Sequence, residues 1–303
     1  MANKNRKTIM GLTGLAAVIG YQIYQNRHVR SRVLEVYYEH LPEELDNYRI
    51  VQISDLHGAV YGRNNARLNR MITRLEPDVL CITGDMVHFK EDTGQAFLDI
   101  IRGLDPELTK LYVSGNHENA RRRNGGYEVL DRSEIYRRLK GAGVVLLDGM
   151  TFQPDHLPIS FSGLFDDFEH YTGIDYNEDD FCPGDHLPMP DRSRFNVALV
   201  HRPNYFRSIS DYGYQLMLSG HIHGGVIRLG RHHGLLSPEM KFFPELDKGL
   251  YRRNESYLHV SSGLGMGKPL PRVANPPEVI LLILRKGISD IRKIPEVSDR
   301  KQQ

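Results

Sequence analysis

Five apolar segments of this chain are each followed by residues that can bind a metal ion. In chain order, these residues are Asp55 and His57, Asp85, Asn116, His201, and His221 and His223. Imidazole together with carboxylate favours Mn, Fe or Zn, whereas oxygen ligands alone favour Mg or Ca. Seven ligands exceed the roughly four to six that one transition metal takes, so they suit two ions that share a bridging carboxylate. Two ions about 3.5–4 Å apart are typical of enzymes that hydrolyse phosphate esters.

The spacing of these residues supports that interpretation. Asp55 and His57 are two residues apart, as are His221 and His223, and in an extended segment this spacing points both side chains of a pair the same way. A single Asp-x-His or His-x-His sequence occurs by chance, but five such pieces after five apolar segments are not expected by chance. Glycine turns the backbone sharply at low steric cost, and it precedes three of the ligands, at Gly84, Gly115 and Gly220.

The elements that would position these residues alternate along the first half of the chain. Apolar periodicity predicts strands at 49–54, 79–83, 110–114 and 144–147, with helices at 65–76, 97–104 and 133–140. This alternation indicates βαβ units and a largely parallel sheet. Strands without intervening helices, which indicate a second sheet, are predicted at 159–164, 196–200, 214–218, 258–261 and 279–284. Ligands bind at the carboxyl ends of strands in open α/β sheets, so all seven residues should gather at one rim.

The order of the motifs resembles the calcineurin-like metallophosphoesterase family over about residues 48–285. The motifs are Asp55-x-His57, Gly84-Asp85, Gly115-Asn116-His117-Glu118, His201 and Gly220-His221-x-His223. The chain is also similar to the bacterial, often membrane-anchored branch with UDP-2,3-diacylglucosamine pyrophosphatase-like enzymes, at Gly224-Gly225, 261–265 and Asn275-Pro276-Pro277-Glu278. The resemblance implies an α/β fold, a four-layer αββα sandwich of two mixed β-sheets flanked by helices. An N-terminal apolar helix is expected in addition.

The resemblance also implies a role for each residue. The first ion would take Asp55, His57, Asp85 and His223, and the second would take Asp85, Asn116, His201 and His221. Asp85 and His117 would be the catalytic residues, Asp85 as the bridge and His117 as general acid toward the leaving group. Imidazole suits that role because it titrates near neutral pH. Many family members carry an acidic residue three places after the bridging aspartate to orient this histidine; here that residue is His88, so the partner of His117 is left open.

The N-terminus carries an apolar stretch at 9–24, preceded by Lys4, Arg6 and Lys7. The stretch is shorter than the ~20 residues of a comfortable membrane span, and no clear cleavage site follows it. We expect a single-pass anchor that holds the protein at the cell membrane; a cleaved export signal and a core helix are the alternatives. The expected domains are an anchor and linker at 1–32, a metallophosphoesterase domain at 33–288 and a polar tail at 289–303.

Composition narrows the classes of partner. Among 303 residues, 39 Lys and Arg stand against 38 Asp and Glu, so a basic excess for nonspecific nucleic-acid binding is missing. We expect no nucleic-acid partner and a monomer. The chain has only Cys81 and Cys182, which excludes a disulfide scaffold and a Cys-rich zinc site. Cys81 lies within an apolar run and is predicted to be a buried core thiol.

Four other segments allow more than one interpretation. Arg121–Arg123 either binds an anionic group or lies in a solvated loop, and 166–191 is either a lid or a surface loop. Gly263–Gly267 is glycine-rich but lacks the strand and helix context of a dinucleotide site. His232 and His233 are interpreted as solvated residues of a polar loop.

The expected function is that of a dinuclear metal-dependent phosphoesterase. With two divalent ions (Mn, Fe or Zn), it would hydrolyse a phosphodiester or pyrophosphate bond through a metal-bridging hydroxide. The expected substrate is a small-molecule or lipid-linked phosphoester, with an envelope component included. One alternative is a phosphomonoesterase that acts on proteins or nucleotides. Another is a non-catalytic, metal-stabilised scaffold at the membrane, which would have no need of His117 beside the metals.

Overall fold

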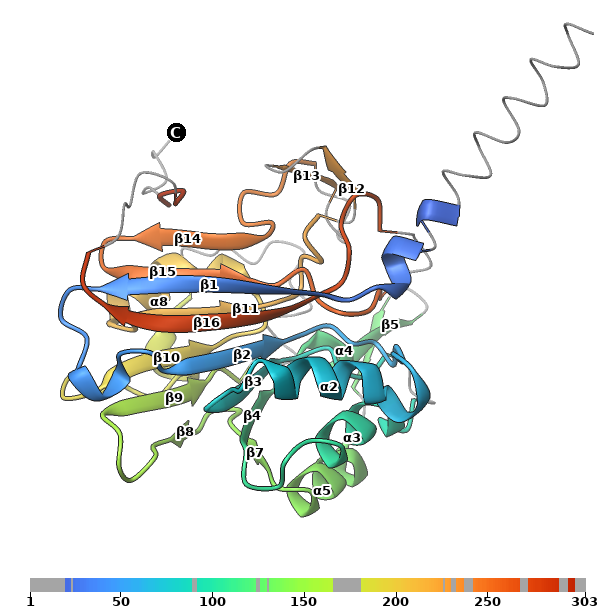
Figure 1. Cartoon of the computed structure of the whole chain (residues 1–303), viewed down its shortest axis with the longest axis horizontal. Helices are drawn as coiled ribbons and strands as arrows, with labels where there is room; N and C mark the ends of the chain where they lie inside the picture. Colours follow the sequence, from blue (N-terminus) through green and yellow to red (C-terminus); the bar gives the residue numbers. More distant parts are fainter. Residues whose placement is uncertain are drawn as a thin grey trace, which may run out of the picture.

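Two six-stranded sheets form the centre of the computed structural model, which describes residues 20–22, 24–88, 92–123, 126–129, 131–165, 181–225, 227–229, 233–236, 242–267, 272–288 and 294–297 (Figure 1). The first sheet has the order β1–β16–β2–β3–β4–β7. Its strands are β1 (Arg30–Tyr38), β16 (Glu278–Lys286), β2 (Arg49–Ile53), β3 (Val79–Thr83), β4 (Thr109–Val113) and β7 (Val144–Leu146). All neighbours are parallel except β16 and β2.

The second sheet has the order β14–β15–β11–β10–β9–β8. Its strands are β14 (Gly249–Arg253), β15 (Ser256–Val260), β11 (Leu216–Ser219), β10 (Phe195–Leu199), β9 (Ile159–Gly163) and β8 (Thr151–Phe152). Its four central strands are parallel, and the edge strands β14 and β8 are antiparallel to their neighbours. Both sheets are therefore mixed, and the predicted α/β fold with mixed sheets is confirmed.

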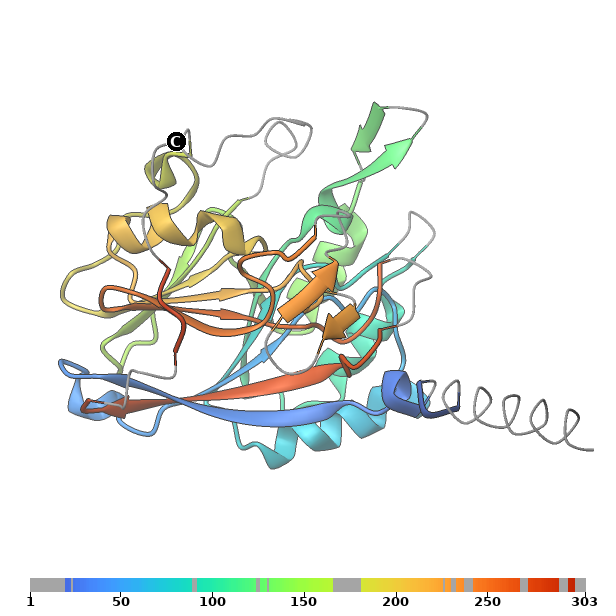
Figure 2. The same ribbon diagram turned by 90° about the horizontal axis from the view of Figure 1, so that it is seen from above.

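The two sheets pack face to face, with helices against their outer faces (Figure 2). On β3, Leu80 and Ile82 face the helical core, whereas Val79 and Cys81 face the second sheet. The sequence of a strand that is covered on both faces is continuously apolar, because neither face meets water. Cys81 is fully buried between the sheets, as expected, and burial raises the pKa of its thiol.

In the described part of the chain, three helices cover the first sheet and α8 covers the second. They are α2 (Ala66–Arg74), α3 (Gln95–Arg102) and α5 (Ser133–Gly141) on the first sheet, and α8 (Phe206–Tyr212) on the second. On α3, Phe97 and Ile101 are buried against the sheet because they share one helix face. The remaining short elements are η1 (Glu43–Leu45), η2 (Arg63–Asn65), α4 (Asn116–Asn119), β5 (Ala120–Arg123), β6 (Gly126–Val129), α7 (Pro183–His186), η4 (Pro203–Tyr205), β12 (Ile227–Leu229) and β13 (His233–Leu236).

The prediction of a single-pass N-terminal anchor, and with it a location at the cell membrane, was wrong. Within the described ranges, no helix combines the length and the apolar character that a bilayer crossing needs. Most of the apolar stretch, residues 9–19 and 23, lies outside the described residues. Residues 20–22 and 24–27 of this region are described and are helical, and β1 follows them. The predicted domain boundaries at 32 and 288 stay a prediction.

Candidate metal centre

The residues that follow five parallel strands meet at one rim of the two sheets. The strands are β2, β3 and β4 of the first sheet and β10 and β11 of the second. Side chains that follow β2, β3, β10 and β11 form groups whose nitrogen and oxygen atoms lie within 4.8 Å of one another. The residue after β4 reaches the same place, because a Cβ added at Gly115 would lie 2.3 Å from Asp85 Oδ1. The rim is thus the carboxyl end that the parallel topology predicts.

The backbone at this rim is strained. The described part of the chain places twelve non-glycine residues at positive φ, and five of them are candidate ligands. They are Asp55 (φ 51°), His57 (46°), Asp85 (54°), His221 (70°) and His223 (51°). Left-handed backbone at a residue other than glycine costs on the order of 1–3 kcal/mol and persists where the surroundings enforce it. Such clustering points to a functional site at the rim.

The first group of facing donors consists of Asp55, His57 and His223, all buried. The Nε2 atoms of His57 and His223 are 3.2 Å apart. Asp55 Oδ1 lies 3.6 Å from His223 Nε2 and 4.0 Å from His57 Nε2. Two nitrogens bound to one zinc-sized ion at tetrahedral angles stand about 3.3 Å apart, so the spacing of the two rings fits a shared ion.

The second group consists of Asp85, His201 and His221. Asp85 Oδ2 lies 3.3 Å from His201 Nε2, and His201 Nε2 lies 3.3 Å from His221 Nδ1. The other nitrogen of His201 donates to the Thr83 carbonyl at 2.7 Å, which orients the ring and leaves Nε2 toward Asp85. Asp85 Oδ2 also lies 3.7 Å from His57 Nε2. Asp85 therefore stands between the two groups.

Asn116, the seventh candidate, begins α4 beside these groups. Its side-chain Oδ1 is buried and has no hydrogen-bond partner among the described residues. A buried acceptor without a partner costs about 1–3 kcal/mol, so an amide oxygen in this position calls for a donor or a cation. The next residue, His117, donates its backbone N–H to Asp85 Oδ1 at 2.8 Å. The unsatisfied oxygen and the donor set together fit divalent cations.

The electrostatics of the cluster favour binding of a cation. Burial, partly offset by the charge on His201, raises the pKa of Asp55 to about 6. Burial also holds the pKa values of His57 and His223 well below the usual range, so both rings are neutral and keep a lone pair. Burial alone would lower the pKa of His201, but the adjacent Asp85 carboxylate outweighs it and raises that pKa to about 10. In the chain alone, a proton on His201 therefore provides the positive charge beside Asp85.

Glu118 holds the backbone of the site, a role that the sequence did not indicate. Its carboxylate is 1% exposed and accepts backbone N–H bonds from Asp85, Met86, Val87 and Gly115 at 2.6–3.0 Å. It therefore ties the turn after β3 to the turn after β4. In the sequence, Glu118 is marked by its place in the Gly-Asn-His-Glu motif. The alternation of apolar residues carries no information about hydrogen bonds from a side chain to backbone amides.

His117 has a main-chain partner in place of a carboxylate. Its Nδ1 lies 3.3 Å from the carbonyl oxygen of His88, which can only accept, so Nδ1–H is the donor. The rings of His117 and His88 are stacked with centroids 5.5 Å apart, and His57 meets His117 edge-on at 4.7 Å. These three rings form a further group whose nitrogens lie within 4.8 Å. His88 thus orients His117 through its backbone.

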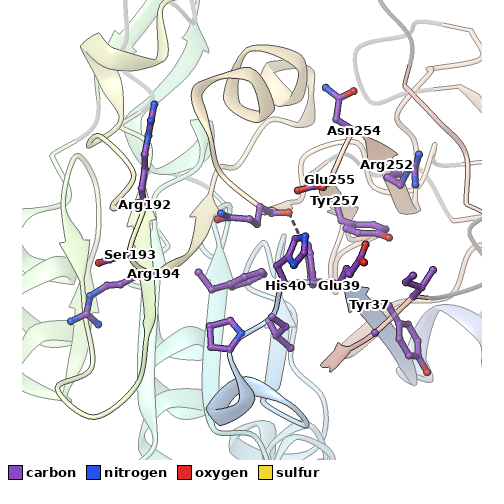
Figure 3. A pocket seen from close by; sticks show the side chains of 17 residues that line it. Tyr37, Glu39, His40, Arg192, Ser193, Arg194, Arg252, Asn254, Glu255 and Tyr257 are labelled. Atoms are coloured by element: carbon purple, nitrogen blue, oxygen red, sulfur yellow. Dashed lines mark hydrogen bonds between the residues drawn. The ribbon is translucent and has the colours of Figure 1, made fainter.

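Three of the other candidate segments fall wholly or partly outside the described residues. The side chains of Arg121–Arg123 and His233 are outside the described part, as are His232 and residues 166–180 of the predicted loop. A hollow of about 460 Å³ lies at the amino ends of β10 and β15, where Arg194 and Tyr257 are among the residues that line it (Figure 3). None of the candidate ligands lines this hollow.

Comparison with known proteins places this geometry in a family. Residues 48–225 match the calcineurin-like phosphoesterase family. The uncharacterised metallophosphoesterase YkuE of Bacillus subtilis is 30% identical over 255 residues, which is 81% of this chain and 82% of that protein. An uncharacterised metallophosphoesterase of Aquifex aeolicus is 27% identical and covers 89% of this chain and 98% of its own. The UDP-2,3-diacylglucosamine pyrophosphatase LpxG of Chlamydia trachomatis is 26% identical over 78% of this chain and 84% of its own.

This chain belongs to the calcineurin-like phosphoesterase family. It is a metal-dependent phosphoric ester hydrolase, a family of enzymes that use divalent metal ions. The sequence resemblance to this family is thereby confirmed, including the similarity to a UDP-2,3-diacylglucosamine pyrophosphatase.

Proposed function

We propose that this protein hydrolyses a phosphodiester or pyrophosphate bond with two divalent ions. The observation that carries the proposal is the pair of buried donor groups on either side of Asp85. One position would be held by Asp55, His57, His223 and Asp85, and the other by Asp85, Asn116, His201 and His221. The mixture of imidazole and carboxylate favours Mn, Fe or Zn. When bound, such ions would polarise the phosphate oxygens and lower the pKa of water.

The residues of the chain have three tasks in this reaction. The six ligands other than Asp85 would fix the distance between the two positions, and Asp85 would join them through Oδ2. Glu118 would hold Asp85 against Asn116, because it binds the backbone on both turns. His117 would donate a proton to the leaving oxygen from Nε2, since its Nδ1 is engaged with the His88 carbonyl.

The proposal of which bond is cleaved is supported by a relative and not by the geometry of the site. A relative with 84% of its length covered is named as a pyrophosphatase of a diacylated UDP-sugar. This favours a pyrophosphate or diester over a phosphomonoester and makes a lipid-linked substrate part of the proposal. A proton donor beside the ions suits an alkyl ester of either kind, because its alkoxide leaving group is a strong base.

Metal analysis and a substrate panel test the proposal together. The purified full chain should bind two equivalents of Mn²⁺ and hydrolyse bis-p-nitrophenyl phosphate faster than p-nitrophenyl phosphate. A UDP-linked diacylated sugar would be the third substrate. Binding of only one equivalent would exclude the dinuclear mechanism. Faster turnover of the monoester would instead identify a phosphomonoesterase.

A further inference from the structure

A glycine-rich segment at Ser262–Gly267 runs along the turn that carries Asp55 and His57; we call it the strap. Leu264 N donates to the Ser54 carbonyl at 3.0 Å, and Gly265 N donates to the Asp55 carbonyl at 2.6 Å. A Cβ added at Gly263 would lie 2.6 Å from Asp55 Cβ, and one at Gly265 would lie 2.0 Å from the Leu56 carbonyl oxygen. Glycine is therefore required for this close approach. The strap fixes the backbone of one side of the first candidate metal position.

Arg272 connects the strap to the other side of that position. Its side chain is among the largest fully buried ones, with 2% of the residue exposed. The guanidinium donates to the Ser262 carbonyl and, through two nitrogens, to the Gly265 carbonyl. Its Nη2 also lies 3.3 Å from His223 Nδ1, so the guanidinium packs against this ring. A histidine that binds an ion through Nε2 keeps its proton on Nδ1, so this contact positions the ring by packing and not by a hydrogen bond. One side chain thus contacts the strap beside Asp55 and the ring of His223.

Two other buried residues close to Arg272 in the sequence also contact His223 or the strap. Asn275 is 1% exposed and donates from Nδ2 to the His223 carbonyl. Glu278 is 1% exposed, accepts the Ser262 N–H at 3.0 Å, and lies 2.7 Å from Lys248 Nζ. These three residues lie beyond the stretch that matches the family, which ends at residue 225. Residues outside the matched stretch therefore keep one of the two donor groups in position.

No hydrogen bond described for Arg272 reaches the second donor group. Asp85, His201 and Asn116 are instead positioned by Thr83, Glu118 and the turns after β3 and β4. We propose that Arg272 is a positioning residue for the first metal position alone, setting the distance between His223 and the Asp55 turn. This inference rests on the proposed two-metal function. Arg272 does not touch the substrate and is not a catalytic residue.

Metal titration of the full chain and its Arg272→Met variant tests the inference. In the metal-free variant, binding of one Mn²⁺ should weaken by about 10–100-fold, the usual effect of removing a group that orients a ligand. Binding of the other should change by less than about 3-fold. At an Mn²⁺ concentration that fills both positions of the parent chain but only the tighter position of the variant, electron paramagnetic resonance should show a coupled pair in the parent. The variant should show an isolated ion. Excess Mn²⁺ should restore turnover, because the catalytic groups are intact.

Two further variants keep the result interpretable. Arg272→Lys retains the positive charge but not the fork of donors, and it should also weaken the first position; tighter binding in Arg272→Met would mean that the guanidinium acts only by repelling the ion. Lys110→Met removes another buried cation, which donates to the carbonyls of Asp105, Pro106 and Leu108 at the far end of β4. This control should lose stability but keep both affinities.

The outcomes separate the two proposals. If the parent chain binds a single equivalent, the two-metal function fails and this inference fails with it. If the parent binds two and Arg272→Met keeps both affinities, only the inference is overturned. Equal weakening of both positions would overturn it as well, because a general loss of packing affects the two positions alike. If Arg272→Met does not fold, Gly263→Ala provides the same test, since it displaces the strap from Asp55.

Discussion

Two regions of this molecule bury histidine in different ways. At the rim, His57, His201, His221 and His223 turn ring nitrogens toward one another at 3.2–3.3 Å. Between the sheets, His259 lies on β15 and is fully buried, and its Nδ1–H donates to Gln52 Oε1 at 2.6 Å. Gln52 in turn donates to Thr83 Oγ1 and to the Ser219 carbonyl. The inner histidine belongs to a hydrogen-bonded layer, whereas the rim histidines stand in pairs with ring nitrogen facing ring nitrogen.

The difference shows that burial alone does not mark a metal ligand. The regular strand backbone around His259 contrasts with the positive φ angles of His57, His221 and His223. A strained backbone persists only where the surroundings enforce it, and a bound ion would stabilise the strained form further. Facing nitrogens on strained turns therefore distinguish the candidate metal centre from a structural histidine. Four substitutions test this comparison.

The largest effect is expected for Asp85→Asn. Asp85 is the acidic residue whose oxygen lies close to both donor groups, so its loss removes charge from both positions at once. We expect the variant to lose both equivalents of metal and to turn over substrate no faster than the uncatalysed reaction. Metal analysis after gel filtration, with a diester assay, measures both properties. Two retained equivalents with near-normal turnover would remove Asp85 from the centre of the site.

His117→Ala should preserve the metals and slow the reaction. The ring lies beside His57 but is held by the His88 carbonyl. For alkyl diesters we expect turnover to fall by ~10²–10⁴-fold, the scale of a positioned acid. The loss should be much smaller for nitrophenyl esters, whose leaving group needs little protonation. An equal loss on both substrates would assign His117 to phosphate binding, and loss of a metal would make it a ligand.

Periodicity in the sequence predicted most of the central strands. The strand at 79–83 is reproduced at β3, the strand at 49–54 is one residue longer than β2, and the strand at 110–114 is shifted by one residue from β4. These strands are apolar on both faces, so the signal is strong. The edge strand β1 was not predicted; its first residues are exposed and charged, as in Arg30 and Arg32. An edge strand depends on its neighbour, here β16, more than on its own pattern.

The sequence also indicated where the candidate ligands lie, but not which residues keep them in position. A metal-binding residue after an apolar strand is visible in the sequence, because parallel strands bring their carboxyl ends together. The strap, Arg272 and Glu118 act through backbone carbonyls and amides, and such bonds leave no periodic signal. Gly263 and Gly265 were visible as glycines, but the close approach to Asp55 that requires them appears only in three dimensions.

Asp55→Gly should reveal the strain at the rim. Asp55 combines a left-handed backbone with a buried carboxyl whose pKa burial raises to about 6, and His221 N donates to it. Glycine relieves both costs and loses that bond, so we expect the metal-free variant to be about 1–2 kcal/mol more stable than the parent at pH 7. With Mn²⁺ present the order should reverse, because the variant binds the ion poorly. Chemical denaturation with and without a chelator measures both.

The control for this substitution is Asn254→Gly. Asn254 has a similar φ of 53° but is an exposed asparagine in the turn between β14 and β15. Asparagine tolerates this conformation, so the change should stay within about 0.5 kcal/mol with or without metal. If Asp55→Gly destabilises the metal-free chain while Asn254→Gly is neutral, the rim backbone is not a reservoir of strain.

The smallest effect at pH 7 is expected for a substitution of His259, and this effect depends on pH. Burial lowers the pKa of His259 to about 4, from 6.5 in the unfolded chain. Above pH 6.5 the ring is neutral in both states, and its hydrogen bond contributes fully to stability. Between pH 6.5 and 4 the unfolded chain binds a proton that the native chain refuses, so the free energy of unfolding falls as the pH falls. Across this range the loss approaches about 3 kcal/mol.

His259→Gln removes that titration while keeping an amide that can donate to Gln52. At pH 7 the variant should be about 1 kcal/mol less stable than the parent, because the 2.6 Å bond is replaced by a less favourable one. The difference should vanish at about pH 6 and change sign below it, since only the parent is penalised by protonation of its unfolded chain. Urea unfolding of both proteins in chelator, from pH 7 to 4.5, isolates this one proton from the rim histidines, which both proteins share. Parallel pH profiles would mean that His259 titrates normally in the native state, and the hydrogen-bonded layer would then be open to water.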